Sequence, residues 1–433
     1  MTKSPKPADY RGEITRHGIA SILLRLGGIA LAFALNVFIA RLLNVGGYGR
    51  YVYVINIANI LVVPCLLGLQ QTRVRYVPHY LEQGKSNLIK GLVAFSRLLV
   101  FTASVIAAIV LLFVTLLLID SDNALYSALL FIPILLPFQA LMELENAGLR
   151  SFKLIVAARL PVQVVRPLLI VLLIVGYVWI TSARPDVQTV LLSTIAATVL
   201  TLLLLWAFMN RRMGDLRSDS IAQYRPKEWI RTSLYLWLIG GFGLFLNYID
   251  VLMVGGMMTT DDAGIYFAAV KISTLIGVGI TAMNIVVAPQ ISQYYSAGKK
   301  SDLQGVITFS TRIIFALTLP AVLIVVFMGE WILSFFGPAF TSAYPALVVL
   351  AIGQLVSAIA GNVGYITTMT GQERISSAIL GVSVVLNLVL NYIFIQNFGI
   401  FGAALATTIT TALWNVALVV FVRKVLKLKS TIV

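Results

Sequence analysis

The residues of this 433-residue chain that could do chemistry are charged and amide side chains inside long apolar runs. Ionisable groups at such positions are costly and mark functional sites by default. The cationic members could bind a phosphate, because a guanidinium offers it two hydrogen bonds and an ammonium a point charge. These candidate anion binders are Arg25, Arg159, Arg166 and Lys271. Two acids, Asp250 and Glu143, are the candidates for taking up and releasing a coupling ion.

Amide residues accompany these charges at helical spacing. Gln139, Glu143 and Asn146 fall at i, i+4 and i+7, so they share one helix face. Two readings stay open: the polar groups line a cavity, or they pair with one another and hold helices together. The polar-cavity reading assigns Asn36, Gln139, Asn146, Asn247, Gln354 and Asn362 to that cavity.

The elements that must position these residues are membrane helices. The chain is 59% hydrophobic and 11% charged, whereas soluble domains carry about 25% charged residues. A bilayer core of roughly 30 Å needs about 20 apolar residues as helix. Twelve stretches qualify, at 18–43, 48–70, 91–119, 124–148, 156–180, 187–209, 229–257, 262–290, 304–328, 341–369, 373–396 and 399–422. The sequence therefore predicts an all-α polytopic membrane protein.

The chain divides into two halves that resemble each other. "YLEQGKSNLIKGLVAFSRLLVF" (80–101) aligns without gaps with "YYSAGKKSDLQGVITFSTRIIF" (294–315). Six helices per half make this a parallel repeat, which places a substrate path between the halves. The predicted parts are a cytoplasmic N-terminal segment, an N-lobe, a cytoplasmic linker, a C-lobe and a basic cytoplasmic tail, at 1–17, 18–209, 210–228, 229–422 and 423–433.

Charge predicts the orientation of the chain. Of 32 Lys and Arg, the predicted topology places only Arg41, Arg50 and Arg184 on one side, together with six acids. Cytoplasmic loops carry the Lys and Arg excess, so both termini are expected in the cytoplasm. The net charge of +15 suits an anionic lipid leaflet. With no separate basic domain, nucleic-acid binding is not expected.

Several chemistries lack their residues. The single cysteine, Cys65, excludes an internal disulfide, and two histidines are too few for a metal site. No nucleotide loop occurs, because the glycines of "NFGIFGAALATT" (397–408) have no following Lys. We expect a short turn at 397–399, then close helix packing through the small residues after it. Neither a cofactor nor enzymatic activity is expected, and any energy used would come from an ion gradient, of protons or sodium, or from the cargo gradient.

Four segments carry a family resemblance. "VVLNLVLNYIFIQNFGIFGAALATTITTALWN" (384–415) resembles the C-terminal motif of the polysaccharide flippases in the multidrug/oligosaccharidyl-lipid/polysaccharide exporter superfamily. "FIARLLNVGGYGRYVYVINIANIL" (38–61), "YIDVLMVGGMMTTDDAGIYFAAVKIS" (248–273) and "GPAFTSAYPALVVLAIGQL" (337–355) are similar to further family motifs. The connection between the predicted spans 156–180 and 187–209, "WITSARPDVQ", departs from the pattern of 384–415 because it lacks the turn of small residues.

The resemblance implies a twelve-helix, two-lobed transporter of the bacterial inner membrane. It implies flipping of undecaprenyl-diphosphate-linked oligosaccharide, for O-antigen, capsule or exopolysaccharide, and association with polysaccharide polymerase machinery. The cationic cavity of the family would here use Arg25, Arg166 and Lys271, and ion coupling would use Asp250. Two alternatives remain: a multidrug exporter of the same superfamily, and a membrane polysaccharide polymerase or ligase.

Overall fold

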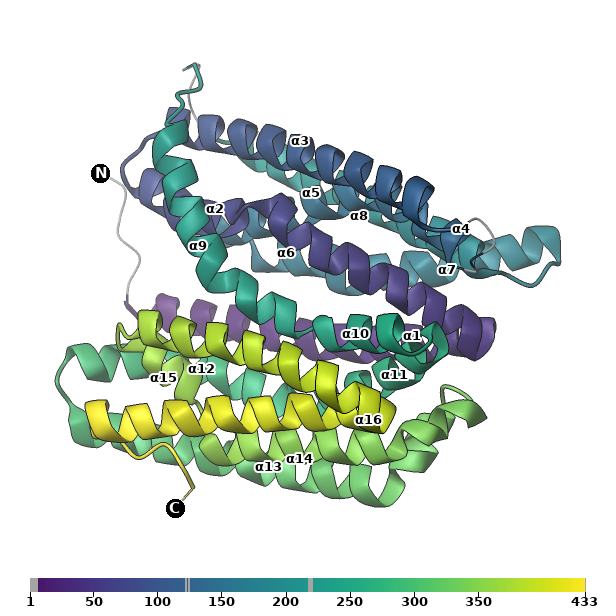
Figure 1. Ribbon diagram of the computed structural model, residues 1–433. Coiled ribbons are helices and arrows are strands. Elements are labelled where there is room, and N and C mark those ends of the chain that lie inside the picture. Colours follow the sequence, from purple (N-terminus) through teal and green to yellow (C-terminus); the bar gives the residue numbers. More distant parts are fainter. Residues whose placement is uncertain (1–6, 121–122, 124, 217–220, 433) are drawn as a thin grey trace. The chain divides into compact units, whose positions relative to one another are not determined.

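The computed structural model describes residues 7–120, 123, 125–216 and 221–432. Residues 1–6 of the predicted N-terminal segment and 217–220 of the predicted linker lie outside this part. The described residues are almost entirely helical and contain no strand (Figure 1). This confirms the predicted all-α class.

The helices fall into two compact units. Unit 1 contains Met1–Leu35 and Leu61–Gly241, and unit 2 contains Asn36–Ile60 and Phe242–Val433. Helices α1 and α9 each contribute to both units. The first half of the chain holds α1 (Pro7–Leu66), α2 (Leu69–Glu82), α3 (Ser86–Leu118), α4 (Tyr126–Leu129), α5 (Ile132–Ser151), α6 (Ile155–Leu160), the π-helical turn η1 (Pro161–Val165), α7 (Arg166–Thr181) and α8 (Val187–Gly214).

The second half holds α9 (Pro226–Leu246), α10 (Ile249–Met257), α11 (Thr260–Ile276), α12 (Val278–Ser296), α13 (Lys300–Ser334), the 3-10 turn η2 (Pro338–Ala343), α14 (Tyr344–Ala360), α15 (Val363–Met369), α16 (Glu373–Phe421) and the π-helical turn η3 (Val422–Leu426). The predicted lobe boundaries stay a prediction.

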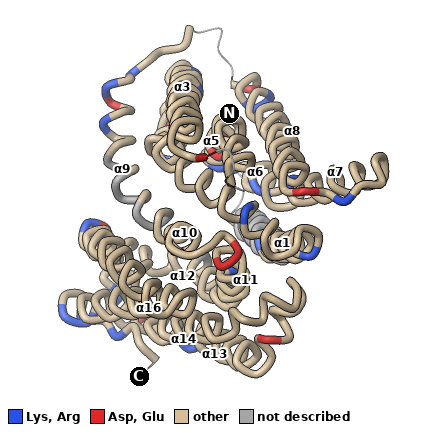
Figure 2. The backbone as a smooth tube through the Cα atoms, turned by 45° about the vertical axis from the view of Figure 1, so that its right-hand side comes forward, with Lys and Arg blue, Asp and Glu red and all other residues tan. Residues whose placement is uncertain are grey.

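Eight helices of the described residues are long and apolar enough to cross a membrane, or nine if the bent pair α11 and α12 is one span. Two of the eight combine two predicted spans each. Helix α1 leaves helical geometry at Asn44, and α16 does so at Gly399. Ten of the predicted spans correspond to these eight helices and an eleventh, 262–290, to the bent pair; the remaining one, 229–257, lies on α9 and α10. Figure 2 shows the long uncharged stretches along these helices that suit a lipid interior.

The sequence repeat reappears as a repeated turn. Gly84 ends the turn between α2 and α3 with φ 66°, and Gly298 ends the turn between α12 and α13 with φ 68°. In both turns the N–H of the following lysine donates to the carbonyl oxygen five residues earlier, at 2.9 Å from Lys85 and 3.0 Å from Lys299. Positive φ favours glycine, so the same turn conformation explains why both halves have a glycine at this position.

The bend in α16 brings its two arms together. Gly399 adopts φ 57°, and beyond it a side chain at Gly402 would collide with the backbone of Phe394. Ala403 and Ala406 are also fully buried. Small residues thus let the two arms pack closely, as their spacing predicts.

The C-terminal residues fold back onto unit 2. The amide of Lys429 donates to Gln304 Oε1 at 2.8 Å, and Gln304 Nε2 donates back to the Lys429 carbonyl at 2.7 Å. Leu428 is 2% exposed and joins an apolar cluster with residues of α12, α13 and α15. The end of the predicted basic tail is therefore part of the packed unit.

Candidate functional site

Three arginines from separate helices lie close together in unit 1. Arg25 on α1 and Arg150 at the end of α5 both interact electrostatically with Arg159 on α6. Arg25 and Arg159 are half-buried. Clustered like charges raise the local positive potential, and guanidinium groups bind phosphate with paired hydrogen bonds. The structure thus brings together two of the four predicted anion binders and adds Arg150.

A glycine allows the close approach of α1 to the chain after α6. A side chain at Gly28 would meet Gln163 Cβ at 2.8 Å. Arg25 lies about one turn before Gly28, and Arg159 about one turn before Gln163. The contact between Gly28 and Gln163 therefore sets how far apart Arg25 and Arg159 lie. Gln163 belongs to η1, and π-helical turns of this kind often lie at functional sites. Arg166 follows η1 directly and is half-buried.

The polar residues of α5 have different surroundings. Gln139 is buried, and Glu143 and Asn146 are half-buried. The amide oxygen of Asn146 is shielded from solvent and has no hydrogen-bond partner among the described residues. Such a group needs a partner from water or a ligand. Within the described part of the chain, Glu143 forms no ion pair, whereas Glu145 forms two.

Asp250 on α10 is the centre of a buried hydrogen-bonded cluster in unit 2. Asn391 Nδ2 donates to Asp250 Oδ1 at 2.8 Å, and the Thr407 hydroxyl donates to Oδ2. Asn387 also interacts with the carboxyl group. Asn387 and Asn391 lie one turn apart on the first arm of α16, and Thr407 lies on the second. The bend at Gly399 therefore brings the partners of Asp250 together.

This cluster can hold a proton or a small cation. The Thr407 hydroxyl has one proton but two acceptors, Asp250 Oδ2 and the Ala403 carbonyl oxygen at 3.0 Å. It can therefore donate to a charged carboxylate, or accept from a protonated one and donate to Ala403. Among the described residues, the buried amide oxygens of Asn387 and Asn391 have no hydrogen-bond partner. Carboxylate, amide and carbonyl oxygens are the ligands of hard cations.

The other predicted residues of unit 2 have separate neighbours. The Lys271 ammonium lies 4.5 Å from the ring centre of Phe267, a cation–π contact. Asn36 Oδ1 accepts a hydrogen bond from the Tyr48 hydroxyl at 3.1 Å. Asn362 Nδ2 donates to a serine on α13, Ser310, at 3.1 Å.

The last two predicted residues lie next to or within breaks between helices. Gln354 on α14 lies against Gly277, which separates α11 from α12, because a side chain at Gly277 would meet its Oε1 at 2.9 Å. Asn247 lies between α9 and α10 and is exposed. A single polar cavity formed by all six amides therefore stays a prediction.

A buried charge network in unit 1 was not predicted. Arg73 is 0% exposed, and its Nη1 donates to Glu145 Oε1 at 3.0 Å. Arg97 Nε and Nη2 donate to the two oxygens of Glu145 at 3.0 and 2.7 Å. Arg73 falls in the connection between the predicted spans 48–70 and 91–119, so it was not among the charges expected inside the membrane. The one signal was its potential counter-ion, Glu145, in an otherwise apolar helix.

Comparison with known proteins identifies the family. The family model described as polysaccharide biosynthesis protein matches residues 14–295, about two thirds of the chain. The chain belongs to the polysaccharide biosynthesis protein family. The MatE family model also matches this family member, over residues 242–393.

A curated relative supports the assignment over part of the sequence. Over 238 residues, 55% of the chain, this family member is 29% identical to a probable low-salt glycan biosynthesis flippase of Haloferax volcanii. The aligned region spans about half of that relative, 49% of its length.

Solved structures show the fold. An inward-facing multidrug resistance MATE family transporter matches with a TM-score of 0.75 and 14% identity, over 93% of this chain and 97% of its own. The lipid II flippase MurJ, in an inward closed conformation, matches with a TM-score of 0.71 and 16% identity, over 94% of this chain and 88% of its own. The family member therefore has the fold of these multi-pass membrane transporters.

Proposed function

We propose that this protein flips undecaprenyl-diphosphate-linked oligosaccharide repeat units from the cytoplasmic to the outer leaflet. The repeat units would belong to an O-antigen, capsule or exopolysaccharide. The cluster of Arg25, Arg150 and Arg159 carries this proposal, because clustered guanidiniums in an apolar helical unit suit a diphosphate. The matching family and the flippase name of the relative from Haloferax volcanii support it.

Transport would proceed by alternating access, with the lipid tail in the bilayer. A ligand shifts a conformational equilibrium only by its differential affinity for the two states. The arginines would therefore bind the diphosphate more tightly in the state open to the cytoplasm. Arg166 and Lys271 are proposed to contact the same substrate. The location would be the inner membrane with both termini in the cytoplasm, and a polysaccharide polymerase would be the partner.

Reconstituted vesicles test the flippase proposal directly. Purified protein is placed in liposomes with a fluorescent undecaprenyl-diphosphate sugar, and its transfer to the outer leaflet is followed by quenching. Arg25→Ala and Arg159→Ala should each lower the transfer rate at least about tenfold, the loss of one charge-assisted phosphate contact. Arg231→Ala, an exposed arginine at the start of α9, is the control and should transfer normally. Wild-type rates for both cluster variants would refute the role of the arginines.

We further propose that Asp250 carries the coupling ion, a proton or a sodium ion. The Thr407 hydroxyl can bond to either the charged or the protonated carboxyl group of Asp250, and the amide oxygens described above can bind a cation. Asp250→Asn should abolish the dependence of transfer on the ion gradient while transfer down the substrate gradient continues. Asp302→Asn, an exposed acid on α13, is the control. Varying sodium at constant pH, and then pH at constant sodium, distinguishes the two ions. Unchanged gradient dependence in Asp250→Asn would place the coupling elsewhere without affecting the flippase proposal.

Multidrug export is a second candidate. A buried acid suits a cationic drug, and Asp250 lies within the region matched by the MatE model. A deletion strain separates the two functions. The flippase proposal expects loss of surface glycan with unchanged drug susceptibility, and the exporter alternative expects the reverse.

A further inference from the structure

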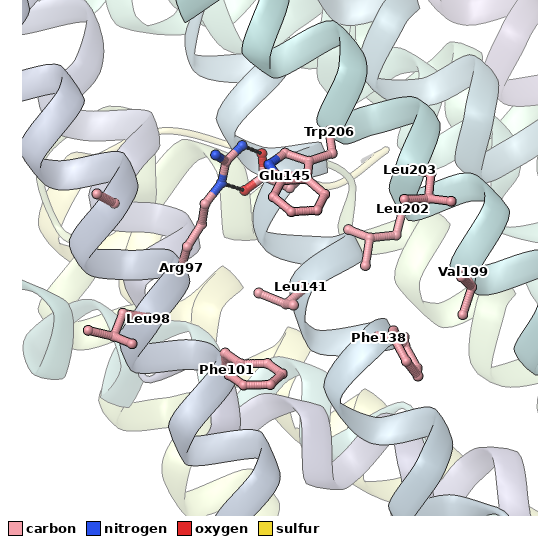
Figure 3. Close-up of a pocket in the computed structure, with 11 residues that line it drawn as sticks. Arg97, Leu98, Phe101, Phe138, Leu141, Glu145, Val199, Leu202, Leu203 and Trp206 are labelled. Atoms are coloured by element: carbon pink, nitrogen blue, oxygen red, sulfur yellow. Dashed lines mark hydrogen bonds and ion pairs between the residues drawn. The ribbon is translucent and has the colours of Figure 1, made fainter.

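Unit 1 contains a pocket separate from the arginine cluster. Its volume is about 510 Å³, and it lies between α3, α5 and α8 (Figure 3). Ligand sites typically range over roughly 300–1,000 Å³. Each helix contributes one face, for example Ala94, Leu98 and Phe101 from α3. The pocket is therefore a defined space large enough for a ligand.

The pocket is charged at one end and apolar at the other. Arg97, Glu145 and Trp206 lie together at one end in Figure 3, and Phe101 and Phe138 lie toward the other. The Arg97 guanidinium also lies 5.5 Å from the centre of the Trp206 ring. A ligand that fits this gradient has a polar head at Arg97 and a hydrocarbon body along the three helices.

The charges at the polar end favour an anionic head. Two guanidiniums, Arg73 and Arg97, share the single carboxylate of Glu145, which leaves one net positive charge. Arg73 is fully enclosed, and its remaining donors reach Ser96 and backbone carbonyls. Arg97 is 24% exposed, so it presents the surplus charge to the pocket.

Arg97 also has hydrogen-bonding capacity left. Two of its N–H groups bind Glu145, and a third binds Asn210 Oδ1 at 3.3 Å. A guanidinium has five N–H donors, so two stay available to an oxygen acceptor after the bonds that Arg97 makes within the described residues. These donors and the net charge suit a phosphate group.

The apolar walls open toward the surface that faces lipid. Leu98 is 65% exposed, and Leu203 and Trp206 are about half exposed. These side chains belong to helices that are apolar enough to span the membrane. Arg97 stands eleven residues into α3, about 16 Å along the helix. A lipid could therefore enter sideways from the leaflet at that end of α3.

We propose that this pocket binds an anionic phospholipid of the bilayer. Its phosphate contacts Arg97, and one acyl chain lies along Leu98, Phe101 and Phe138. The apolar walls of the pocket favour a phosphate that carries a hydrocarbon chain over free phosphate. The net positive charge at the polar end favours an anionic lipid over a zwitterionic one. The bound lipid joins α3, α5 and α8 and stabilises unit 1.

Lipid binding is measured on the purified full-length protein in mild detergent. Phosphatidylglycerol or phosphatidylethanolamine is added, and native mass spectrometry counts bound lipid while a melting curve reports stabilisation. Arg97→Gln removes the charge and should weaken phosphatidylglycerol binding about fivefold or more, the effect of one basic residue near an anionic leaflet. Because this variant also loses ion pairs with Glu145, a second variant is needed.

Ala94→Phe fills the pocket while keeping Arg97 and Glu145, the two pocket residues that form an ion pair. It should abolish both the bound phosphatidylglycerol and the rise in melting temperature. Ile106→Phe, at an exposed position on the same helix outside the pocket, is its control. Arg211→Gln, an exposed arginine next to Asn210, is the control for charge. Both controls should bind phosphatidylglycerol as the wild type does.

Three results would overturn the proposal. The first is wild-type binding of phosphatidylglycerol by Ala94→Phe. The second is equal binding of phosphatidylethanolamine and phosphatidylglycerol by the wild type. The third is recovery of a lipid-linked sugar, or of detergent alone, as the molecule that Ala94→Phe displaces.

Discussion

Replacing Glu145 by alanine should strongly destabilise unit 1. Glu145 is 2% exposed and accepts three hydrogen bonds of 2.7–3.0 Å from two arginines. Without it, Arg73 is a fully buried cation with no carboxylate partner among the described residues. Breaking a buried pair by removing one partner costs about 3–5 kcal/mol. At roughly 2–4 °C per kcal/mol for a domain of about 200 residues, the melting temperature should fall by about 6–20 °C.

Thermal unfolding in detergent, followed by tryptophan fluorescence, measures this change. Glu143→Ala is the matched control, because it removes a carboxyl group two residues earlier that forms no ion pair within the described chain. It should melt within about 2 °C of the wild type, as a substitution away from such networks costs under roughly 0.5 kcal/mol. Replacing the triad by Arg73→Met, Glu145→Leu and Arg97→Met should restore most of the stability. Equal melting of Glu145→Ala and Glu143→Ala would refute this reasoning.

Two further predictions concern unfolding in detergent. Gly91→Ala should lower the melting temperature by several degrees, because the new methyl group would collide with the backbone of Gln223. The control is Gly305→Ala, at the matching position of the repeat, where the methyl group meets open space, so this variant should melt as the wild type or slightly higher. Equal shifts in the two variants would contradict the contact between Gly91 and Gln223. Deleting residues 427–433 should lower the stability of unit 2 by about 3 kcal/mol or more. The deletion removes two hydrogen bonds to Gln304 and one buried leucine, Leu428. Unchanged melting of the shortened chain would show that its end does not pack as described.

The helices could be predicted because each span leaves a local record of about 20 apolar residues. The turn expected at 397–399 appears as the bend at Gly399, since glycine tolerates the positive φ required there. The repeat was visible because its turn uses a glycine and a lysine in both halves. These features depend on neighbouring residues alone.

The partners of the charged groups were harder to predict. Asp250 is a candidate from the sequence, whereas its partners Asn387, Asn391 and Thr407 lie in the stretch 384–415, whose sequence indicates only a family motif and close helix packing. Their meeting depends on how α10 and both arms of α16 pack, which no short sequence window encodes. Arg73 was missed for the same reason, because its counter-ion lies 72 residues away.

The assignment of Asn36–Ile60 to unit 2 has a consequence for synthesis of the chain. This segment leaves the ribosome about 180 residues before Phe242, where the rest of unit 2 begins. At roughly 5–20 residues per second, its partners follow about 10–40 s later. During that interval Tyr48 lacks Phe267, Phe336 and Phe340, the aromatic rings that surround it in the finished protein. The nascent segment must therefore be held in the lipid, or by the insertion machinery, until the second half arrives.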